Sequence, residues 1–175
     1  MKRGLFISIE GSEGVGKTTN LEHVNSLLVQ AGHEVVVTRE PGGTPLAEAI
    51  RTMLLESQRT EPMDPRAETL LIFAARAQHV RERIEPALKR GQTVLCDRFT
   101  DATLAYQGGG RGIDRGTLVG LADFAHGDIW PDLTLYLDAP VDVAFDRIEG
   151  RSLDRIEQEN RAFFERVREV YLELA

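Results

Sequence analysis

The residues with the most specific chemistry form a short run near the N-terminus, with the spacing Gly-x-x-x-x-Gly-Lys-Thr. In such a run, backbone N–H groups and the positive end of the following helix surround a phosphate chain. Lys17 would reach the β- and γ-phosphates of a nucleoside triphosphate, and the Thr18 hydroxyl would bind Mg²⁺. The alternative is a glycine-rich turn with a solvated lysine. The run comprises Gly11, Ser12, Glu13, Gly14, Val15, Gly16, Lys17, Thr18 and Thr19.

Acidic and basic side chains follow the other apolar runs of the chain. Asp97 ends the run Thr93–Cys96 and is a candidate Mg²⁺ ligand, directly or through water; a helix N-cap or an ion pair with Arg98 is the alternative. Arginines are frequent near the same ends, and their forked guanidinium groups match phosphate oxygens. For each one the alternative is a surface charge. These arginines are Arg39, Arg51, Arg76, Arg98, Arg147, Arg151 and Arg155.

A long helical pattern places Phe73 and Arg76 three residues apart, and hence on one face. The ring would stack on a base while the guanidinium binds its phosphate, or Phe73 is ordinary core. The four histidines are scattered without the spacing of metal ligands. The sequence therefore supports no metal site other than the one for Mg²⁺.

The elements that position these residues alternate between strands and helices. The four strand-like runs are Leu5–Ile9, Glu34–Thr38, Thr93–Cys96 and Leu133–Leu137. Parallel strands end at one edge of a sheet, so this order predicts a single α/β domain whose parallel sheet has helices on both faces and its site residues on one edge. The expected helices are Lys17–Ala31, Leu46–Leu55, Arg66–Arg90 with a kink or break at Pro86, Thr100–Gln107, a helix from the Asp114 cap to His126, Val141–Ile148, and a last one from about Asp154.

Composition narrows the class of protein. A net charge of −7 argues against a general nucleic-acid or membrane-surface binder, although local basic sites stay open. One cysteine, Cys96, allows no disulfide within the chain, and no apolar run nears the roughly 20 residues of a membrane span. The stretch before Leu5 has no room for a signal peptide, so the expected compartment is the cytoplasm.

Missing motifs narrow the chemistry further. The chain has no Asn-Lys-x-Asp or Asp-x-x-Gly motif of a regulatory GTPase and no Ser-Gly-Gly-Gln motif of a transporter ATPase. It is also too short for a typical helicase or motor core. A compact phosphotransferase remains.

Five motifs together resemble the bacterial thymidylate kinases, over essentially the whole chain. They are Gly11–Thr19, Arg39–Thr44 with Arg51, Phe73–His79, Asp97-Arg98 with Ala105–Gly112, and Leu153–Glu159. The resemblance implies a P-loop fold, Mg²⁺ as cofactor, and the reaction ATP + dTMP to ADP + dTDP on the route to dTTP. A kinase for another nucleotide or deoxynucleoside, or a non-catalytic nucleotide-binding module, is the alternative.

The resemblance also implies roles for individual residues. Glu13 would bind the sugar 3′-hydroxyl of dTMP, Tyr106 would crowd the 2′ position, and Phe73 would stack on thymine. Thr103 and Gln107 would approach the polar edge of the base. Glu40-Pro41 resembles a turn that can contain a cis peptide. The acceptor phosphate would be held by Arg39, Arg76 and Arg98, with Arg51 in support.

Two regions differ among members of this family. Some members carry an arginine at the position of Val15. In this chain, a lid at about residues 147–156 would supply that positive charge instead. Its arginines, which share a face if the segment is helical, are Arg147, Arg151 and Arg155. The family often has an aromatic residue where this chain has Ile72. It usually continues with a fifth strand and a terminal helix, so a truncated chain or an omitted tail is expected after Ala175.

The family is usually a homodimer. Apolar positions on the predicted helices would serve such an interface or the core equally well. These positions are Leu70, Leu118 and Leu121.

Overall fold

The computed structural model describes residues 3–56, 58, 60–150 and 152–175. Within them the chain forms one parallel sheet in the order β2-β3-β1-β4. Register aligns Ile7 of β1 with Leu95 of β3 and with Leu133 of β4. β1 thus lies between β3 and β4. The strands are β1 (Phe6–Glu10), β2 (Val35–Arg39), β3 (Thr93–Asp97) and β4 (Leu133–Tyr136).

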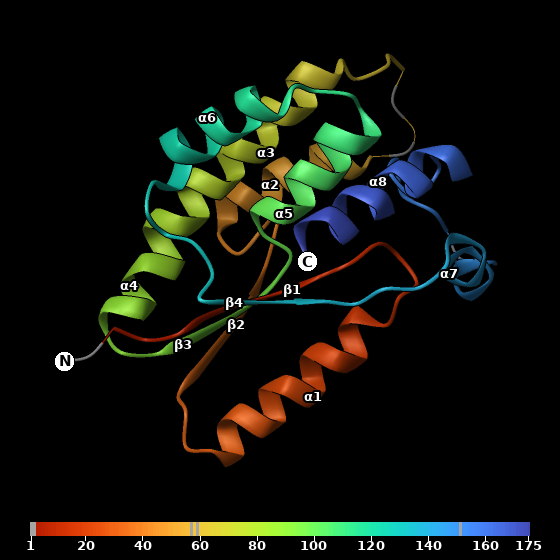
Figure 1. Ribbon diagram of the computed structural model, residues 1–175. Coiled ribbons are helices and arrows are strands. Elements are labelled where there is room, and N and C mark those ends of the chain that lie inside the picture. Colours follow the sequence, from red (N-terminus) through yellow and green to blue (C-terminus); the bar gives the residue numbers. More distant parts are fainter. Residues whose placement is uncertain (1–2, 57, 59, 151) are drawn as a thin grey trace.

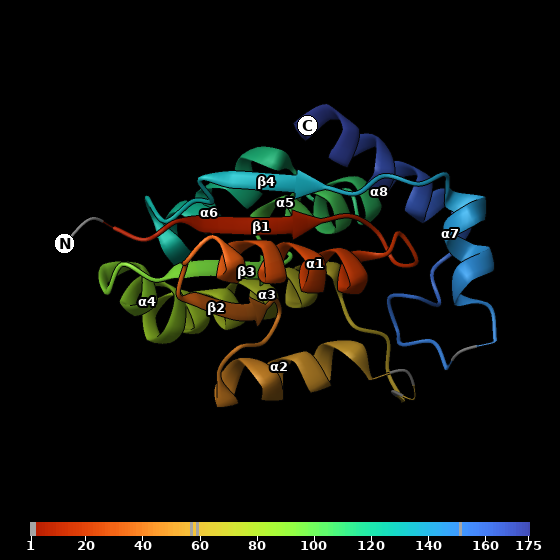
Figure 2. The same cartoon turned by 90° about the horizontal axis from the view of Figure 1, so that it is seen from below.

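Helices cover both faces of this sheet, as predicted. α1 (Lys17–Gln30) lies alone on one face, and the main helical layer lies on the other (Figure 1). α7 (Val141–Ile148) stands beyond the carboxyl ends of the strands (Figure 2). The remaining helices are α2 (Pro45–Leu55), α3 (Pro65–His79), α4 (Glu85–Lys89), α5 (Thr100–Thr103), α6 (Arg115–His126) and α8 (Arg161–Leu174).

The sheet is buried on both faces because alternate residues of β1 and β3 point to opposite layers. Phe6 and Cys96 pack under the helical layer against Ile84, whereas Ile9 and Leu95 pack toward α1. Burial raises the pKa of the Cys96 thiol well above its usual value, as expected for a core cysteine.

Pro86 divides the long helix that the sequence predicted. The helix runs as α3, a π-helical segment Val80–Ile84, and α4, which has Pro86 in its first turn. Proline has no N–H to bond the preceding turn, so the wider turn accommodates it.

The glycine-rich sequence Gly108–Gly112 predicts a flexible loop, and for Gly108–Gly110 that prediction is wrong. These glycines end a π-helical segment, Leu104–Gly110, that packs on α8. A Cβ on Gly109 would lie 2.8 Å from the Arg166 carbonyl oxygen, and one on Gly110 would overlap the Phe163 ring. Because glycine has no side chain, the segment can approach α8 closely at these positions.

The predicted start of the last helix at Asp154 is also wrong. The Asp154 carboxylate accepts the N–H groups of Ile156 and Glu157 at 2.9 Å each, which holds a turn. α8 begins at Arg161, with the Asn160 side chain accepting from Phe163 N at 2.9 Å.

α7 ends at Ile148, two residues before Gly150, whose φ is 81°. Arg147 and Arg155 therefore do not share a helix face in this state. Arg151, the third predicted lid arginine, lies outside the described residues. In the described part of the chain, no helix has the length and apolarity of a membrane span.

Candidate active site

The run Gly11–Thr18 connects β1 to α1 at the carboxyl edge of the sheet. Gly11 (φ 140°) and Gly14 (φ 74°) use backbone conformations that favour glycine, and a Cβ at either would collide with Leu137 or Ala144. Lys17 Nζ donates to the Ser12 carbonyl oxygen at 2.7 Å. Burial and the neighbouring Arg98 cation lower the pKa of Lys17 to about 8.

Arg98 connects this loop to β3, the strand that pairs with β1. It follows β3 with φ 70°, a left-handed conformation that is uncommon for non-glycine residues and that clusters at functional sites. Its guanidinium lies 2.6 Å from Glu13 Oε1, 3.2 Å from the Tyr171 hydroxyl, and over the Tyr106 ring at 4.9 Å. Arg98 is thus held in one orientation by groups from three elements.

Glu13 is the centre of that cluster. Its second oxygen accepts the Tyr106 hydroxyl at 2.5 Å. Burial alone would raise the pKa of Glu13, but the Arg98 and Lys17 cations outweigh it and lower the pKa. An ionised Glu13 therefore joins the phosphate loop to the residues behind it.

Arg76 is buried on α3 with a 2% exposed side chain. Its Nε donates to Glu40 at 2.6 Å, and one terminal nitrogen donates to the Phe99 carbonyl at 3.1 Å and to Thr103 at 3.0 Å. The other, Nη1, has no hydrogen-bond partner although it is buried. Such a group needs an acceptor, and a bound ligand can supply it.

Glu40 fixes this arginine from behind. Its other oxygen pairs with His79 Nδ1 at 2.9 Å, and His79 Nε2 bonds Thr38 at 2.7 Å. Burial opposes ionisation of Glu40, but Arg76 and His79 outweigh it and lower its pKa. The Glu40-Pro41 peptide is cis, a form that the family turn can contain.

These side chains face one cavity, the central pocket, between α3, α5 and the segment after α7. It brings together most of the residues predicted for the acceptor. The predicted residues that line it are Glu13, Pro41, Arg51, Arg76, Arg98, Thr103, Tyr106, Gln107 and Arg155.

Phe73 does not line the central pocket. It is 5% exposed and packs with Leu104 and Leu118 in the core under α6. Ile72 lines the pocket in its place. Phe73 still shares a face with Arg76, whose guanidinium lies 5.1 Å from the centre of the Phe73 ring. The structure nevertheless places Ile72, four residues before Arg76, at the pocket where Phe73 was predicted to stack.

Sequence reasoning also missed Glu68, which lines the same pocket. Glu68, Ile72 and Arg76 follow at intervals of four and so share one face of α3. That spacing was the available signal.

Arg39 and Arg51 have different surroundings. Arg51 donates to the Pro41 carbonyl at 3.0 Å and supports the pocket wall. Arg39 is exposed, pairs with Glu48 at 2.9 Å, and lines a second, more open hollow. We call it the Thr18 hollow because Thr18 lies in it.

The Thr18 hollow also contains Asp97. The buried Oδ1 of Asp97 has no hydrogen-bond partner. An unpartnered carboxylate oxygen and an exposed hydroxyl on the lining of one hollow suit Mg²⁺, which usually keeps several waters and takes few protein ligands. In the described residues, no cluster of three or more His, Cys, Asp or Glu side chains offers a site of another kind.

The described lid arginines have separate partners. Arg147 donates to the Gly14 carbonyl at 3.1 Å and so lies at the phosphate loop. Arg155 pairs with buried Glu68 at 2.7 Å, away from that loop. Of these two arginines, Arg147 has the position predicted for a catalytic lid residue and Arg155 does not.

Glu13 thus has a phosphate loop on one side and a pocket lined by four arginines on the other, a layout suited to two phosphate-bearing ligands. Fold and site together define a P-loop phosphotransferase. The family model described as thymidylate kinase matches residues 9–175. The chain belongs to the thymidylate kinase family.

Individual relatives agree with this assignment. A thymidylate kinase of Pseudomonas savastanoi pv. phaseolicola is 56% identical over 173 residues, which cover 98% of this chain and 82% of the relative. One of Chromohalobacter salexigens is 57% identical over 174 residues, with the same coverage. The crystal structure of thymidylate kinase from Ehrlichia chaffeensis superposes with a TM-score of 0.81 at 34% identity, covering 99% of this chain and 87% of that one.

Proposed function

We propose that this enzyme transfers the γ-phosphoryl group of ATP to dTMP, giving ADP and dTDP on the route to dTTP, with Mg²⁺ as cofactor. The observation that carries the proposal is Glu13. It belongs to the phosphate loop yet lines the central pocket and pairs with Arg98 there. Donor and acceptor phosphates would meet at this residue.

On the donor side, loop N–H groups and the start of α1 surround the ATP phosphates. Lys17 would exchange the Ser12 carbonyl for a phosphate oxygen, and Arg147 would likewise bind a donor phosphate. Because phosphoryl transfer depends mainly on positioning and charge stabilisation, these cations would supply most of the rate enhancement.

On the acceptor side, Arg98 would hold the dTMP phosphate and steer its attacking oxygen. The free Nη1 of Arg76 would donate to the same nucleotide. Glu13 and Tyr106 would lie against the sugar, where the Tyr106 ring leaves little room for a 2′-hydroxyl. Thr103 and Gln107 would face the polar edge of the base.

Thr18 and Asp97 would hold the Mg²⁺ ion. When bound, the ion would neutralise charge on the donor phosphates. In the transfer itself, an oxygen of the acceptor phosphate forms a bond to the γ-phosphorus while the bond to the bridging oxygen of ADP breaks. No covalent enzyme intermediate is required.

A panel of acceptors tests the substrate. ADP release would be measured with dTMP, dUMP, dCMP, dGMP and AMP at equal concentrations, and dTMP should react fastest. A faster rate with another nucleotide would assign the enzyme to that substrate. Tight binding of ATP and dTMP without any ADP release would make the protein a binding module.

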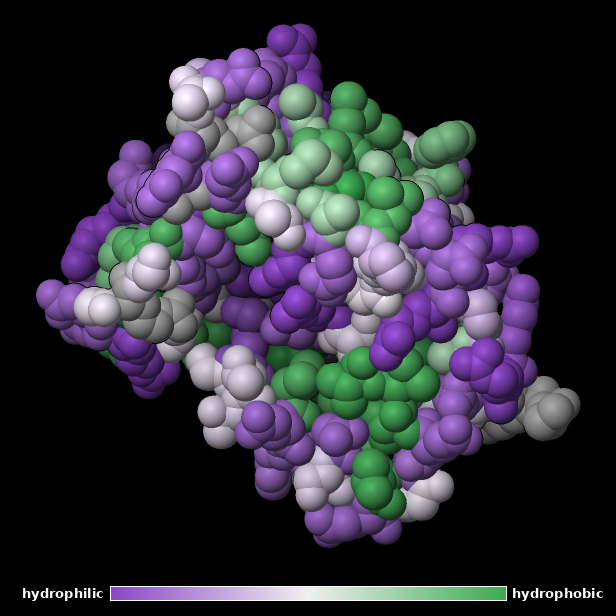
Figure 3. All heavy atoms as spheres, turned by 180° about the vertical axis from the view of Figure 1, so that it is seen from behind, coloured by the Kyte–Doolittle hydropathy of each residue, from purple (hydrophilic) through white to green (hydrophobic). Residues whose placement is uncertain are grey.

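We also propose that the protein works as a homodimer in the cytoplasm. Leu70 of α3 and Val119 and Phe124 of α6 are 57%, 45% and 90% exposed. Figure 3 shows hydrophobic side chains gathered over the helical layer on one face. Leu118 is fully buried in the core, so it does not belong to this surface.

The reduced thiol of Cys96 fits a cytoplasmic location.

A further inference from the structure

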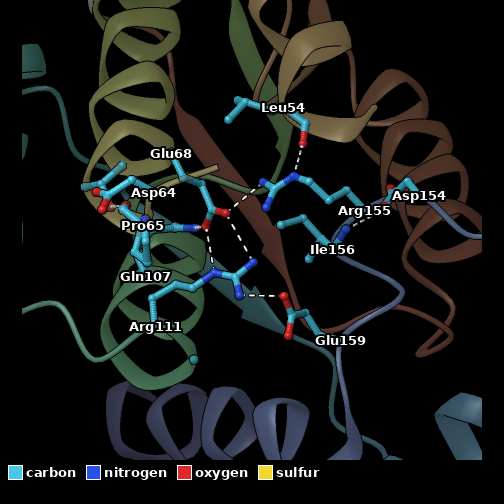
Figure 4. A network of polar contacts seen from close by, with 12 residues as sticks. Leu54, Asp64, Pro65, Glu68, Gln107, Arg111, Asp154, Arg155, Ile156 and Glu159 are labelled. Carbon is cyan, nitrogen blue, oxygen red and sulfur yellow. Dashed lines mark hydrogen bonds and ion pairs between the residues drawn. The ribbon is translucent and has the colours of Figure 1, made fainter. Parts of the chain in front are cut away.

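Glu68 is a carboxylate with no exposed surface that the catalytic scheme does not use. Its Oε1 accepts from Gln107 Nε2 at 2.7 Å and Arg111 Nε at 3.2 Å. Its Oε2 accepts from Arg155 at 2.7 Å and Arg111 at 3.2 Å. Figure 4 shows these donors converging on Glu68 from two separate segments, one with Gln107 and Arg111 and the other with Arg155. Both oxygens are therefore fully occupied.

The charges of this cluster are balanced. Two guanidinium groups, of Arg111 and Arg155, lie against two carboxylates, because Arg111 also pairs with Glu159 at 2.5 Å. Burial would raise the pKa of Glu68, but the hydrogen bonds from Arg111 and Gln107 outweigh it and lower the pKa. Glu68 is ionised, and removing its charge would leave two partly buried cations with a single counter-ion.

Through Arg155, Glu68 fastens the segment that follows the lid. Arg155 Nε also donates to the Leu54 carbonyl at 2.7 Å, and its backbone N–H bonds the Leu55 carbonyl at 3.2 Å. Asp154, Arg155 and Ile156 line the central pocket. The position of these three residues at the pocket therefore depends on the ion pair between Glu68 and Arg155.

Glu68 also determines which end of the Gln107 side-chain amide faces the pocket. A carboxylate can only accept, so the Gln107 amide must turn its NH₂ group toward Glu68. Its carbonyl oxygen is then left to accept a hydrogen bond in the pocket that Gln107 lines. A carbonyl oxygen complements a pyrimidine ring with an N3–H group, as in thymine and uracil, and repels the unprotonated N3 of cytosine.

We propose that Glu68 is a positioning residue for the acceptor base: it orients the Gln107 amide to select a base with N3–H, and it holds residues 152–159 over the pocket. The first half rests on the proposed function, since it assumes a pyrimidine acceptor. The second half does not depend on any activity.

The test variant is Glu68→Gln, which keeps the shape but removes the charge and adds a donor. We expect the KM for dTMP to rise roughly tenfold or more, because a buried charged acceptor is lost. The KM for ATP should stay unchanged. The ratio of kcat/KM for dTMP over dCMP should fall by about tenfold, because the Gln107 amide is then free to turn.

This ratio is measured within one enzyme sample, so partial unfolding does not affect it. Glu165→Gln on the exposed face of α8 is the matched control, with wild-type kinetics expected. Arg155→Lys should raise the KM for dTMP while leaving the dTMP to dCMP ratio intact. A folded Glu68→Gln enzyme with the wild-type ratio would overturn the orienting role.

Hydrogen exchange tests the second role without any substrate. In Glu68→Gln, amide exchange should accelerate at residues 152–159 and stay unchanged in α6. Equal acceleration throughout would show a merely structural role and contradict the proposal. Failure of the wild-type enzyme to phosphorylate any nucleotide would refute the proposed function alone, because the exchange result would still stand or fall separately.

Discussion

At the scale of single residues, the pKa of Lys17 shows how its surroundings affect a measurable property. Its pKa of about 8 lies well below the ordinary value of 10.5, because burial and Arg98 disfavour its charge. A triphosphate placed beside it would restore the charge and raise the pKa again. ATP binding should therefore take up a proton at alkaline pH.

This linkage predicts a pH dependence. ATP affinity should be nearly constant below pH 8 and fall as the pH rises above it, by at most about tenfold per pH unit, because one proton is bound. Calorimetric Kd values between pH 7 and 9.5 would measure it. Lys17→Met should lack this step, and a flat wild-type profile would contradict the assignment.

Ile72 and Phe73 are neighbours in sequence with opposite surroundings. Phe73→Ala should lower the free energy of unfolding by about 3–5 kcal/mol, because it leaves a cavity in the core. It should leave the KM for dTMP of the folded enzyme unchanged.

Ile72→Ala should do the reverse, raising the KM for dTMP with a smaller loss of stability, because Ile72 lines the pocket. Urea unfolding and steady-state kinetics on both variants would separate the two effects. A larger change in KM for Phe73→Ala than for Ile72→Ala would restore Phe73 as the stacking residue.

Local motifs were predictable residue by residue, whereas orientations were not. The glycines and Lys17 of the phosphate loop have fixed spacing, so their geometry follows from the sequence. Phe73 and Ile72 both suit an apolar helix face, and only the packing of α3 against α6 decides which one reaches the pocket. Glu68 depends on partners 39, 43 and 87 positions away, which no local pattern indicates.

At the scale of elements, the segment Leu104–Gly110 and α8 depend on each other. Three consecutive glycines indicate a flexible loop by propensity, but tertiary packing overrides that preference. Their missing side chains let the segment lie against Phe163 and the Arg166 backbone. The same packing places Tyr106 and Tyr171 beside Arg98.

A pair of glycine substitutions tests this packing. Gly110→Ala should lower the free energy of unfolding by about 1–3 kcal/mol, because its Cβ would overlap Phe163. Gly120→Ala, in the interior of α6 with no atom near its Cβ, should raise it by about 0.5–1 kcal/mol. Denaturant titrations measure both. A neutral or stabilising Gly110→Ala would show that the contact is loose.

At the scale of the whole molecule, the order of strands and helices was predictable because apolar runs and glycine turns alternate regularly. The association of two chains was not, since Leu70 and Leu118 have the same hydrophobicity in sequence and only the fold exposes one and buries the other. The exposed surface on α3 and α6 is the basis for the proposed homodimer.

Phe124→Asp tests that surface. A charge at this 90% exposed position should not disturb the fold, yet it should convert a dimer into a monomer in sedimentation equilibrium. Leu172→Asp, at an exposed position of α8, is the control and should stay dimeric. A monomeric wild-type protein, or a dimeric Phe124→Asp variant, would exclude this interface.

The central claim is that a phosphoryl group passes directly from ATP on the loop to dTMP in the central pocket. Single-turnover transfer from γ-labelled ATP, with nucleotides and protein separated at each time point, measures it most directly. The label should move from ATP to dTDP without appearing on the protein, and Lys17→Ala should abolish transfer while dTMP still binds. Label on the protein, or loss of dTMP binding in Lys17→Ala, would contradict the account.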